Sequence, residues 1–161
     1  MSRDDLSHLD STGRARMVDV SGKPETERWA VARGHVLLTP ETLQQARAGD
    51  LKKGDLRAVA ELAGVMAAKR TAELIPLCHP IPLTQVQVEV AFDDQLPGVV
   101  VTSTVRTTGR TGVEMEAMTA VAVAALAVYD MVKGIDRRAR ITDVRLLEKH
   151  GGRSGDLVLE P

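Results

Sequence analysis

The longest apolar stretch in the chain runs from residue 112 to residue 133 and predicts one long helix. Residues that favour helices, namely Ala, Met, Leu and Glu, are frequent in it, and neither Pro nor an interior Gly interrupts it. Thr111-Gly112 before the stretch and Gly134 after it are typical start and stop signals. Because its middle is apolar on almost every side and too short to cross a bilayer, we expect this helix to be buried from several directions.

Charged residues occur only at the two ends of this helix, with Glu114 and Glu116 at the start and Asp130 and Lys133 at the finish. Glu114 and Asp130 are 16 positions apart, which corresponds to about 24 Å along a helix. A small-molecule pocket is on the order of 10 Å across, so one chain cannot place both helix ends around one ligand. Either the two ends serve different purposes, or a second copy of the chain brings its own helix end to the site. We favour the second interpretation.

Alternating apolar and polar positions elsewhere in the chain predict four strands. We place them at residues 27–39, 84–92, 99–107 and 139–147. The alternation of the first strand changes parity at Gly34, which indicates a bulge.

Two further helices are predicted before the second strand. Thr39-Pro40 is typical of a helix start and opens a short helix that ends at about Gly49. Asp55 is expected to cap a longer helix that runs from Leu56 to about Leu74.

The resulting element order is β-α-α-β-β-α-β. With the short helix as an insertion, this order predicts an α+β fold of the ferredoxin-like βαββαβ type, an antiparallel sheet with helices packed on one face. Val86, Val88 and Val90 must then face the helices. We expect residues 1–16 to be a mobile arm and residues 17–161 to form a single catalytic domain.

Composition excludes several classes of function. The chain has 161 residues with 21 Lys and Arg against 22 Asp and Glu, and its only aromatic residues are Trp29, Phe92 and Tyr129, so neither its charge nor a stacking surface favours binding of nucleic acid. A single cysteine, Cys78, excludes an internal disulfide and a multi-Cys zinc site. The polar N-terminal segment indicates no targeting or membrane-spanning signal, so we expect a soluble cytoplasmic protein.

Two places in the chain combine stiffness or charge with groups that can transfer protons. His79 lies in a loop with three prolines in seven residues, which is compatible with a structural histidine and also with an imidazole fixed for chemistry. Asp130 and Lys133 lie on one helix face, where they form either a weak surface ion pair or an acid/base couple. Lys69 and Arg70, near a helix end, are equally compatible with the helix dipole and with a site.

Taken together, these segments resemble one family, the cyclic pyranopterin monophosphate synthases known as molybdenum cofactor biosynthesis protein C. The resemblance covers nearly the whole chain, and its IPLCHP and TGVEMEA blocks are highly specific. The segments that carry it are MVDVS from Met17, the region of Arg28, KGD at 53–55, AAKRTAELIPLCHPIPL at 67–83, TGRTGVEMEAMTAVAVAALAVYDMVK at 108–133 and VRLLEKHGGRSGD at 144–156. Arg110 and Arg153 stand where Lys is common in the family, which keeps the charge and changes its geometry.

The resemblance implies a lyase that converts 3′,8-cyclo-7,8-dihydro-GTP into cyclic pyranopterin monophosphate and releases pyrophosphate, an early step in molybdenum cofactor biosynthesis. It also implies a homohexamer, built as a trimer of dimers, with its sites at the dimer interface. The catalytic positions of the family fall on Lys53, His79, Glu114, Glu116, Asp130 and Lys133. Its substrate contacts fall on Leu77, Cys78, His79, Met115 and Glu116, with Arg28, Lys69, Arg70, Lys149 and Arg153 as cations for the triphosphate.

Side chains alone can supply the proton transfers and the phosphoryl displacement of such a reaction, so we expect no resident cofactor and no metal ligands, with Mg²⁺ as an optional aid. Asp130 would act as acid or base with Lys133 tuning it, Lys53 and His79 would exchange protons with the substrate, and Glu114 or Glu116 would position water or the guanine edge. A binding module that returns an anionic metabolite unchanged is the competing class. A purely structural scaffold fits the clustered lysines and carboxylates poorly.

Overall fold

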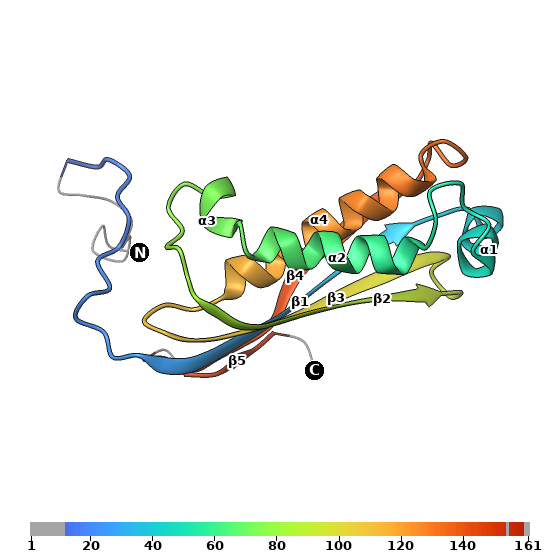
Figure 1. The fold of residues 1–161 in the computed structure, drawn as a ribbon. Coiled ribbons are helices and arrows are strands. Elements are labelled where there is room, and N and C mark those ends of the chain that lie inside the picture. Colours follow the sequence, from blue (N-terminus) through green and yellow to red (C-terminus); the bar gives the residue numbers. More distant parts are fainter. Residues whose placement is uncertain (1–11, 154, 160–161) are drawn as a thin grey trace.

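A computed structural model describes residues 12–153 and 155–159, which form one five-stranded antiparallel sheet with helices on one face (Figure 1). The strands lie in the order β2-β3-β1-β4-β5. The elements, in chain order, are β1 (Thr26–Leu37), α1 (Pro40–Ala48), α2 (Leu56–Ala68), α3 (Thr71–Leu74), β2 (Leu83–Asp93), β3 (Gly98–Gly109), α4 (Glu114–Val132), β4 (Arg140–His150) and β5 (Leu157–Val158).

The sheet confirms the predicted α+β, ferredoxin-like arrangement. β1 lies in the middle, paired with β3 on one side and with β4 on the other, and β2 and β3 form a hairpin. The β1–β4 register shifts twice, once between Arg33 and His35, as the parity change at Gly34 predicted. A Cβ at Gly34 would lie 2.8 Å from Val121 Cγ1 and 2.9 Å from Val144 Cγ2, so the glycine lets α4 approach the bulge closely.

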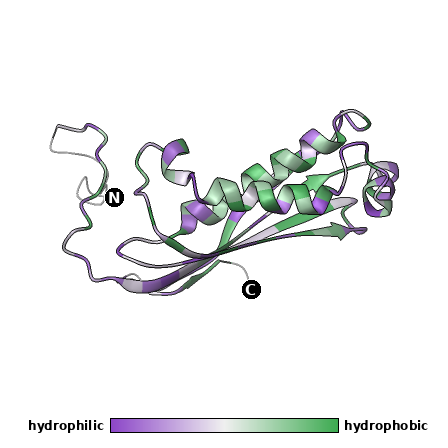
Figure 2. Ribbon diagram, viewed as in Figure 1, coloured by the Kyte–Doolittle hydropathy of each residue, from purple (hydrophilic) through white to green (hydrophobic). Residues whose placement is uncertain are grey.

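The core lies between the sheet and the helices α2 and α4, which run across the same face (Figure 1). Hydrophobic residues follow both helices and the strands below them (Figure 2). Val88 and Val90 are buried against the helices, as the alternation of β2 predicted, and Val86 packs against the same core. α4 is long and apolar enough to span a bilayer by composition, but half of its most apolar stretch is buried inside the domain, as expected of a core helix.

The helix boundaries correct two predictions. The helix that begins at Leu56 ends at Ala68 instead of about Leu74, because the backbone departs from helical geometry at Arg70. The buried hydroxyl of Thr71 donates to the carbonyl of Ala68 at 3.0 Å, and a separate short turn, α3, follows. By contrast, Thr39 and Asp55 cap α1 and α2 as predicted.

The second correction concerns the start of α4. Its N-cap is Val113, which provides no side-chain hydrogen bond, so Thr111-Gly112 is not the cap. The first turn instead carries Glu114 and Glu116. Because no side chain caps the helix, its first backbone N–H groups and their partial positive charge face the space in front of the N-terminus.

The two ends of the chain differ in how far the structure describes them. Most of the predicted N-terminal arm, residues 1–11, lies outside the described residues, whereas residues 12–16 are exposed. Leu157 and Val158 add a short fifth strand beside β4 that was too brief to predict from alternation.

Candidate active site

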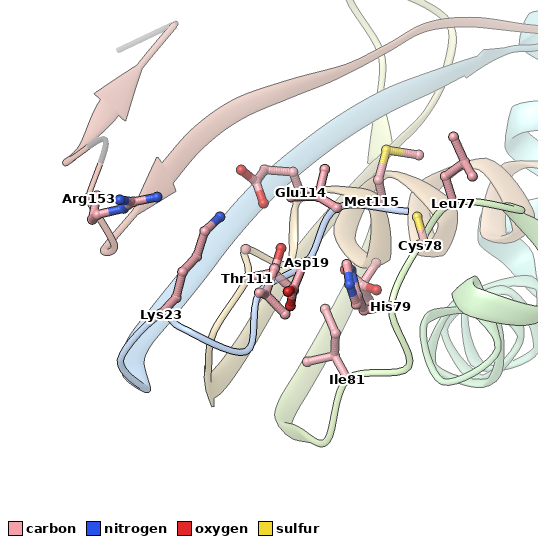
Figure 3. A pocket seen from close by; sticks show the side chains of 14 residues that line it. Asp19, Lys23, Leu77, Cys78, His79, Ile81, Thr111, Glu114, Met115 and Arg153 are labelled. Atoms are coloured by element: carbon pink, nitrogen blue, oxygen red, sulfur yellow. The ribbon is translucent and has the colours of Figure 1, made fainter. Parts of the chain in front are cut away.

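A cavity of about 560 Å³ opens at the N-terminal end of α4, where four segments distant in sequence meet. Figure 3 shows Leu77, Cys78 and His79 on one side of this cavity and Lys23 and Arg153 on the other. We call this the α4-start cavity. The residues that line it are Val18, Asp19, Val20, Lys23, Leu77, Cys78, His79, Ile81, Thr111, Gly112, Glu114, Met115, Glu116 and Arg153.

Glu116 is the most perturbed titratable group in this cavity. Its side chain is only 3% exposed, and burial, reinforced by the neighbouring charge of Glu114, raises its pKa from 4.5 to about 7, although a hydrogen bond from its own backbone N–H opposes the rise. A carboxyl group with a pKa near neutrality can both accept and donate a proton under physiological conditions. Glu116 therefore has the protonation behaviour of a general acid/base.

Other groups around Glu116 are arranged by the same first turn of α4. The carboxylate of Glu114 accepts a hydrogen bond from the ammonium of Lys149 at 2.7 Å, so in the isolated chain part of the positive charge of Lys149 is already neutralised. Burial and the charge of Glu116 raise the pKa of the Cys78 thiol. Cys78 is thus less suited to act as a thiolate nucleophile than an ordinary cysteine.

The cations gather in an adjoining cavity of about 430 Å³, which shares Lys23 and Arg153 with the α4-start cavity and adds Arg28. Arg28 Nε donates to the carbonyl of Gly109 at 2.9 Å, which fixes the guanidinium in place. Thr26 also lines this space, and its buried hydroxyl oxygen has no hydrogen-bond partner among the described residues. Three cations and an unsatisfied hydroxyl suit a polyanionic group.

Lys53, Asp130 and Lys133 lie together around a different cavity, of about 290 Å³, at the opposite end of α4. The Lys53 ammonium donates to the Asp130 carboxylate at 2.5 Å and to the Asp130 carbonyl at 2.8 Å, and the Lys133 ammonium lies 2.6 Å from the same carboxylate. Hydrogen bonds from Lys133 and Lys53 lower the pKa of Asp130 to about 2, and the bond to Asp130 raises the pKa of Lys133. In the single chain, Asp130 is half exposed, and its charge state is set by these two lysines rather than by burial.

The structure thus divides the predicted residues between the two ends of α4. Leu77, Cys78, His79, Glu114, Met115, Glu116 and Arg153 line the α4-start cavity, and Arg28 lines the cavity beside it. A smaller cavity of about 140 Å³ shares His79 and Glu116 and adds Lys69. Arg70 is exposed between α2 and α3 and is not among the lining residues of the α4-start cavity.

Sequence reasoning did not select Asp19 and Lys23 as site residues. Both line the α4-start cavity, and Figure 3 shows the Asp19 carboxylate between Lys23 and His79. Hydrogen bonds from the side chain and the backbone of Ser21 lower the pKa of Asp19. The available signal for Asp19 was the MVDVS segment, residues 17–21, which contributed to the family resemblance but was too short to judge by pattern; Lys23 lies outside that segment.

Among the described residues, no group of three or more His, Cys, Asp or Glu side chains is arranged to hold a metal ion.

The fold and the site together define a ferredoxin-like α+β domain whose core helix starts at a small-molecule cavity that adjoins a second cavity lined by cations. The chain belongs to the MoaC family, whose model matches residues 17–152. It is 60% identical to the cyclic pyranopterin monophosphate synthase of Roseiflexus castenholzii, over 97% of this chain and 99% of that protein. It is 62% identical to the protein of the same name from Thermomicrobium roseum, over 94% and 91%, and 58% identical to that from Dinoroseobacter shibae, over 96% and 98%.

Proposed function

We propose that this protein is a cyclic pyranopterin monophosphate synthase, which converts 3′,8-cyclo-7,8-dihydro-GTP into cyclic pyranopterin monophosphate with release of pyrophosphate. Membership of the MoaC family and the names of the similar proteins support the reaction. The observation that carries it in this chain is Glu116, a buried carboxyl group with a pKa of about 7 that lines the α4-start cavity next to the cavity where the cations gather. We place the reaction in the cytoplasm, as part of molybdenum cofactor biosynthesis.

The proposed binding mode places the triphosphate among the cations and the purine-derived ring beside α4. Lys23, Arg28 and Arg153 would hold the phosphates, since they converge on adjoining cavities. The ring would then lie near His79 and Glu116, where these side chains exchange protons with its nitrogens. Attack of a ribose-derived hydroxyl on the α-phosphate would expel pyrophosphate into the cationic cavity.

The residues at the far end of α4 require a further proposal. Lys53, Asp130 and Lys133 surround a separate cavity, and the length of α4 places them about 24 Å from Glu114 along the helix. We infer that a second copy of the chain supplies this cluster to the α4-start cavity of the first. The assembly we propose is a homohexamer, a trimer of dimers.

Exposed apolar side chains on the helical face support such an association. Val59, Leu62 and Met66 are 44%, 61% and 47% exposed, and their spacing places them along one side of α2. Leu126 of α4 is 56% exposed. Exposed apolar side chains in a row along a helix are typical of an interface between protein chains.

The charge states at the far end suggest how the cluster would act. Because the pKa of Asp130 is lowered to about 2 and that of Lys133 is raised, both groups are charged at neutral pH. As a charged group, Asp130 would hold Lys53 and Lys133 in position, and the two ammonium groups would stabilise negative charge that develops on the substrate. Proton exchange with Asp130 or Lys133 would require substrate entering between the subunits to displace their partners.

Incubation of the purified protein with 3′,8-cyclo-7,8-dihydro-GTP tests the reaction. We expect stoichiometric pyrophosphate and cyclic pyranopterin monophosphate, identified by mass. A metabolite-binding module would return the compound unchanged, and that result would refute the proposal. Repeating the assay in EDTA and with added Mg²⁺ determines whether a magnesium ion on the departing pyrophosphate assists the displacement.

Mixing two inactive variants tests the shared site. We expect Glu116→Gln to inactivate the α4-start cavity and Lys53→Ala to inactivate the far cluster, which we define as Lys53, Asp130 and Lys133. If each site combines the two ends from different chains, dimers formed by unfolding and refolding the two variants together contain one intact site and regain activity. If the mixture stays as inactive as its components while both variants assemble normally, the two ends do not form one site.

A further inference from the structure

His150, the last residue of β4, lies on the opposite face of the sheet from the residue before it. Lys149 points to the helical side, where it bonds to Glu114, whereas His150 stacks on Trp29 of β1. The two ring centroids are 3.8 Å apart and the ring planes differ by 8°. The imidazole therefore has a fixed plane and little freedom to rotate away from its partners.

Both ring nitrogens of His150 face a carboxylate. Nε2 lies 3.1 Å from Glu148 Oε2, and Nδ1 lies 3.2 Å from Asp156 Oδ2. A neutral imidazole carries one N–H and can donate to only one of these carboxylates, while the imidazolium donates to both. The arrangement is complete only when His150 is protonated.

Asp156 connects this histidine to the glycine turn, which we define as Gly151, Gly152 and Arg153. Its second oxygen, Oδ1, accepts a hydrogen bond from the backbone N–H of Gly151 at 3.1 Å. One carboxylate thus ties the imidazole of His150 to the first residue of the turn.

At Gly151 the glycine turn passes so close to the backbone of β1 that a larger residue would not fit, and at Gly152 a larger residue would displace the guanidinium of Arg28. A Cβ at Gly151 would lie 2.2 Å from the carbonyl oxygen of Glu27, and one at Gly152 would lie 2.1 Å from Arg28 Nη1. Both glycines have positive φ, of 87° and 79°. The turn carries Arg153, which lines the α4-start cavity and the cavity beside it.

We propose that His150 is a positioning residue: its imidazolium, held by Trp29 and bonded to Asp156, fixes the glycine turn so that Arg153 can bind the polyphosphate of the substrate. This role rests on the proposed function, because it assumes that the cavity binds a polyphosphate. His150 itself does not line either cavity. Deprotonation of His150 removes one of its two hydrogen bonds, loosens the turn and weakens binding.

The charged groups around His150 favour protonation within the physiological range. Burial opposes the charge, but the hydrogen bonds to Asp156 and Glu148 outweigh it and raise the pKa of His150 above 6.5. On the other side of Trp29, the guanidinium of Arg106 lies 5.4 Å from the indole ring and forms an ion pair with Glu27 at 3.5 Å. Because the folded-state pKa is raised, the stabilising bond is fully present below about pH 6.5 and is lost as the pH rises through the raised value.

Binding of inorganic pyrophosphate, measured by calorimetry from pH 6 to pH 8.5, tests the positioning role without requiring turnover. His150→Phe keeps a ring to stack on Trp29 and removes both hydrogen bonds. We expect it to bind pyrophosphate about fivefold more weakly than the wild type at pH 6, the upper range for a partly exposed ion pair, and we expect this difference to shrink towards pH 8.5 as His150 loses its proton. His150→Arg keeps a planar cation that can stack and donate to both carboxylates, and we expect it to restore tight binding at every pH.

The matched control is His35→Phe. His35 lies on β1, six residues after Trp29, and is paired with Asp143 at 3.5 Å. The variant should bind pyrophosphate as the wild type does at each pH. Because the protonation of pyrophosphate itself changes equally for all variants, comparison with this control removes that contribution. With the cyclised GTP compound as substrate, His150→Phe should raise KM about fivefold and leave kcat unchanged. Thermal melting shows that each variant is folded.

Three results would overturn the positioning role. They are unchanged pyrophosphate affinity in His150→Phe, an unchanged pH dependence in that variant, and a failure of His150→Arg to restore binding at pH 8.5 when folded. Absence of turnover in the wild type, by contrast, would overturn the proposed function and leave the pyrophosphate measurement valid.

Discussion

Replacing Glu116 with Gln tests the central electrostatic claim about the α4-start cavity. The substitution keeps the size and planar shape of the side chain and removes its ability to ionise. In the wild type, the carboxyl group is 3% exposed and its pKa is raised to about 7 by burial and by the charge of Glu114. The folded protein therefore holds a proton on Glu116 over a pH range in which the unfolded chain has already released it.

The size and sign of the effect follow from linkage. The difference between 4.5 and about 7 corresponds to about 3 kcal/mol. Between these two pH values the native state binds more protons than the unfolded state, so the free energy of unfolding falls as the pH rises. The destabilisation caused by ionising the buried carboxyl group is absent below pH 4.5 and complete above about pH 7. The Gln variant has no ionisable group at this position and is not destabilised in this way. At pH 8 the variant should be more stable than the wild type by up to about 3 kcal/mol.

Urea denaturation at pH 5, 6, 7 and 8 measures this difference directly. The control is Glu41→Gln, which removes an exposed carboxylate from the first turn of α1. It measures how much the loss of a carboxylate at a helix N-terminus changes stability when burial is not involved. We expect the same Glu116→Gln variant to lose about 10² to 10⁴ in turnover, because it can no longer transfer a proton. A stability difference between variant and wild type that is the same from pH 5 to pH 8 would refute the reasoning about Glu116.

Three further predictions concern the far cluster and the core. Lys53→Met should raise the NMR titration midpoint of the Asp130 carboxylate above about 2, because one of its two lysine partners is lost; an unchanged midpoint would contradict the assignment. Gly34→Ala should destabilise the fold by about 1–3 kcal/mol in urea, because the new methyl would lie 2.8 Å from Val121 Cγ1; wild-type stability would show that the bulge can expand. Ser103→Ala should cost about 1 kcal/mol, since its buried hydroxyl donates to a carbonyl of α4 at 2.7 Å, and an unchanged melting curve would exclude that contribution.

The fold was predictable because its elements carry strong local patterns. Strict alternation around Val88 and the change of parity at Gly34 specified the sheet faces and the bulge, and both are confirmed. The break after Ala68 was not predictable, because most of the residues around it favour helices and the helix ends through a tertiary arrangement that buries Thr71. Tertiary packing overrode local propensity at that point.

The site was only partly predictable. The family resemblance selected His79, Glu114 and Glu116, and the structure brings all three to one cavity. It did not indicate which carboxylate is perturbed, because the two lie two residues apart in the same first turn, and only the packing of the domain buries Glu116 and leaves Glu114 beside Lys149.

The turn after β4 shows why register must be known before a motif can be interpreted. Lys149 and His150 are neighbours in one block of the family resemblance, and as residues in a strand they point to opposite faces. Lys149 therefore pairs with Glu114, which lines the cavity, whereas His150 can affect the cavity only through the turn that follows. The pairing of Trp29 with His150 in the sheet determines these two roles. It stacks the indole ring on the imidazole, so that both imidazole nitrogens remain free to bond to the carboxylates. A shift of one residue in that pairing would exchange the two roles, so a motif read without its strand register would assign the histidine to the wrong face of the sheet.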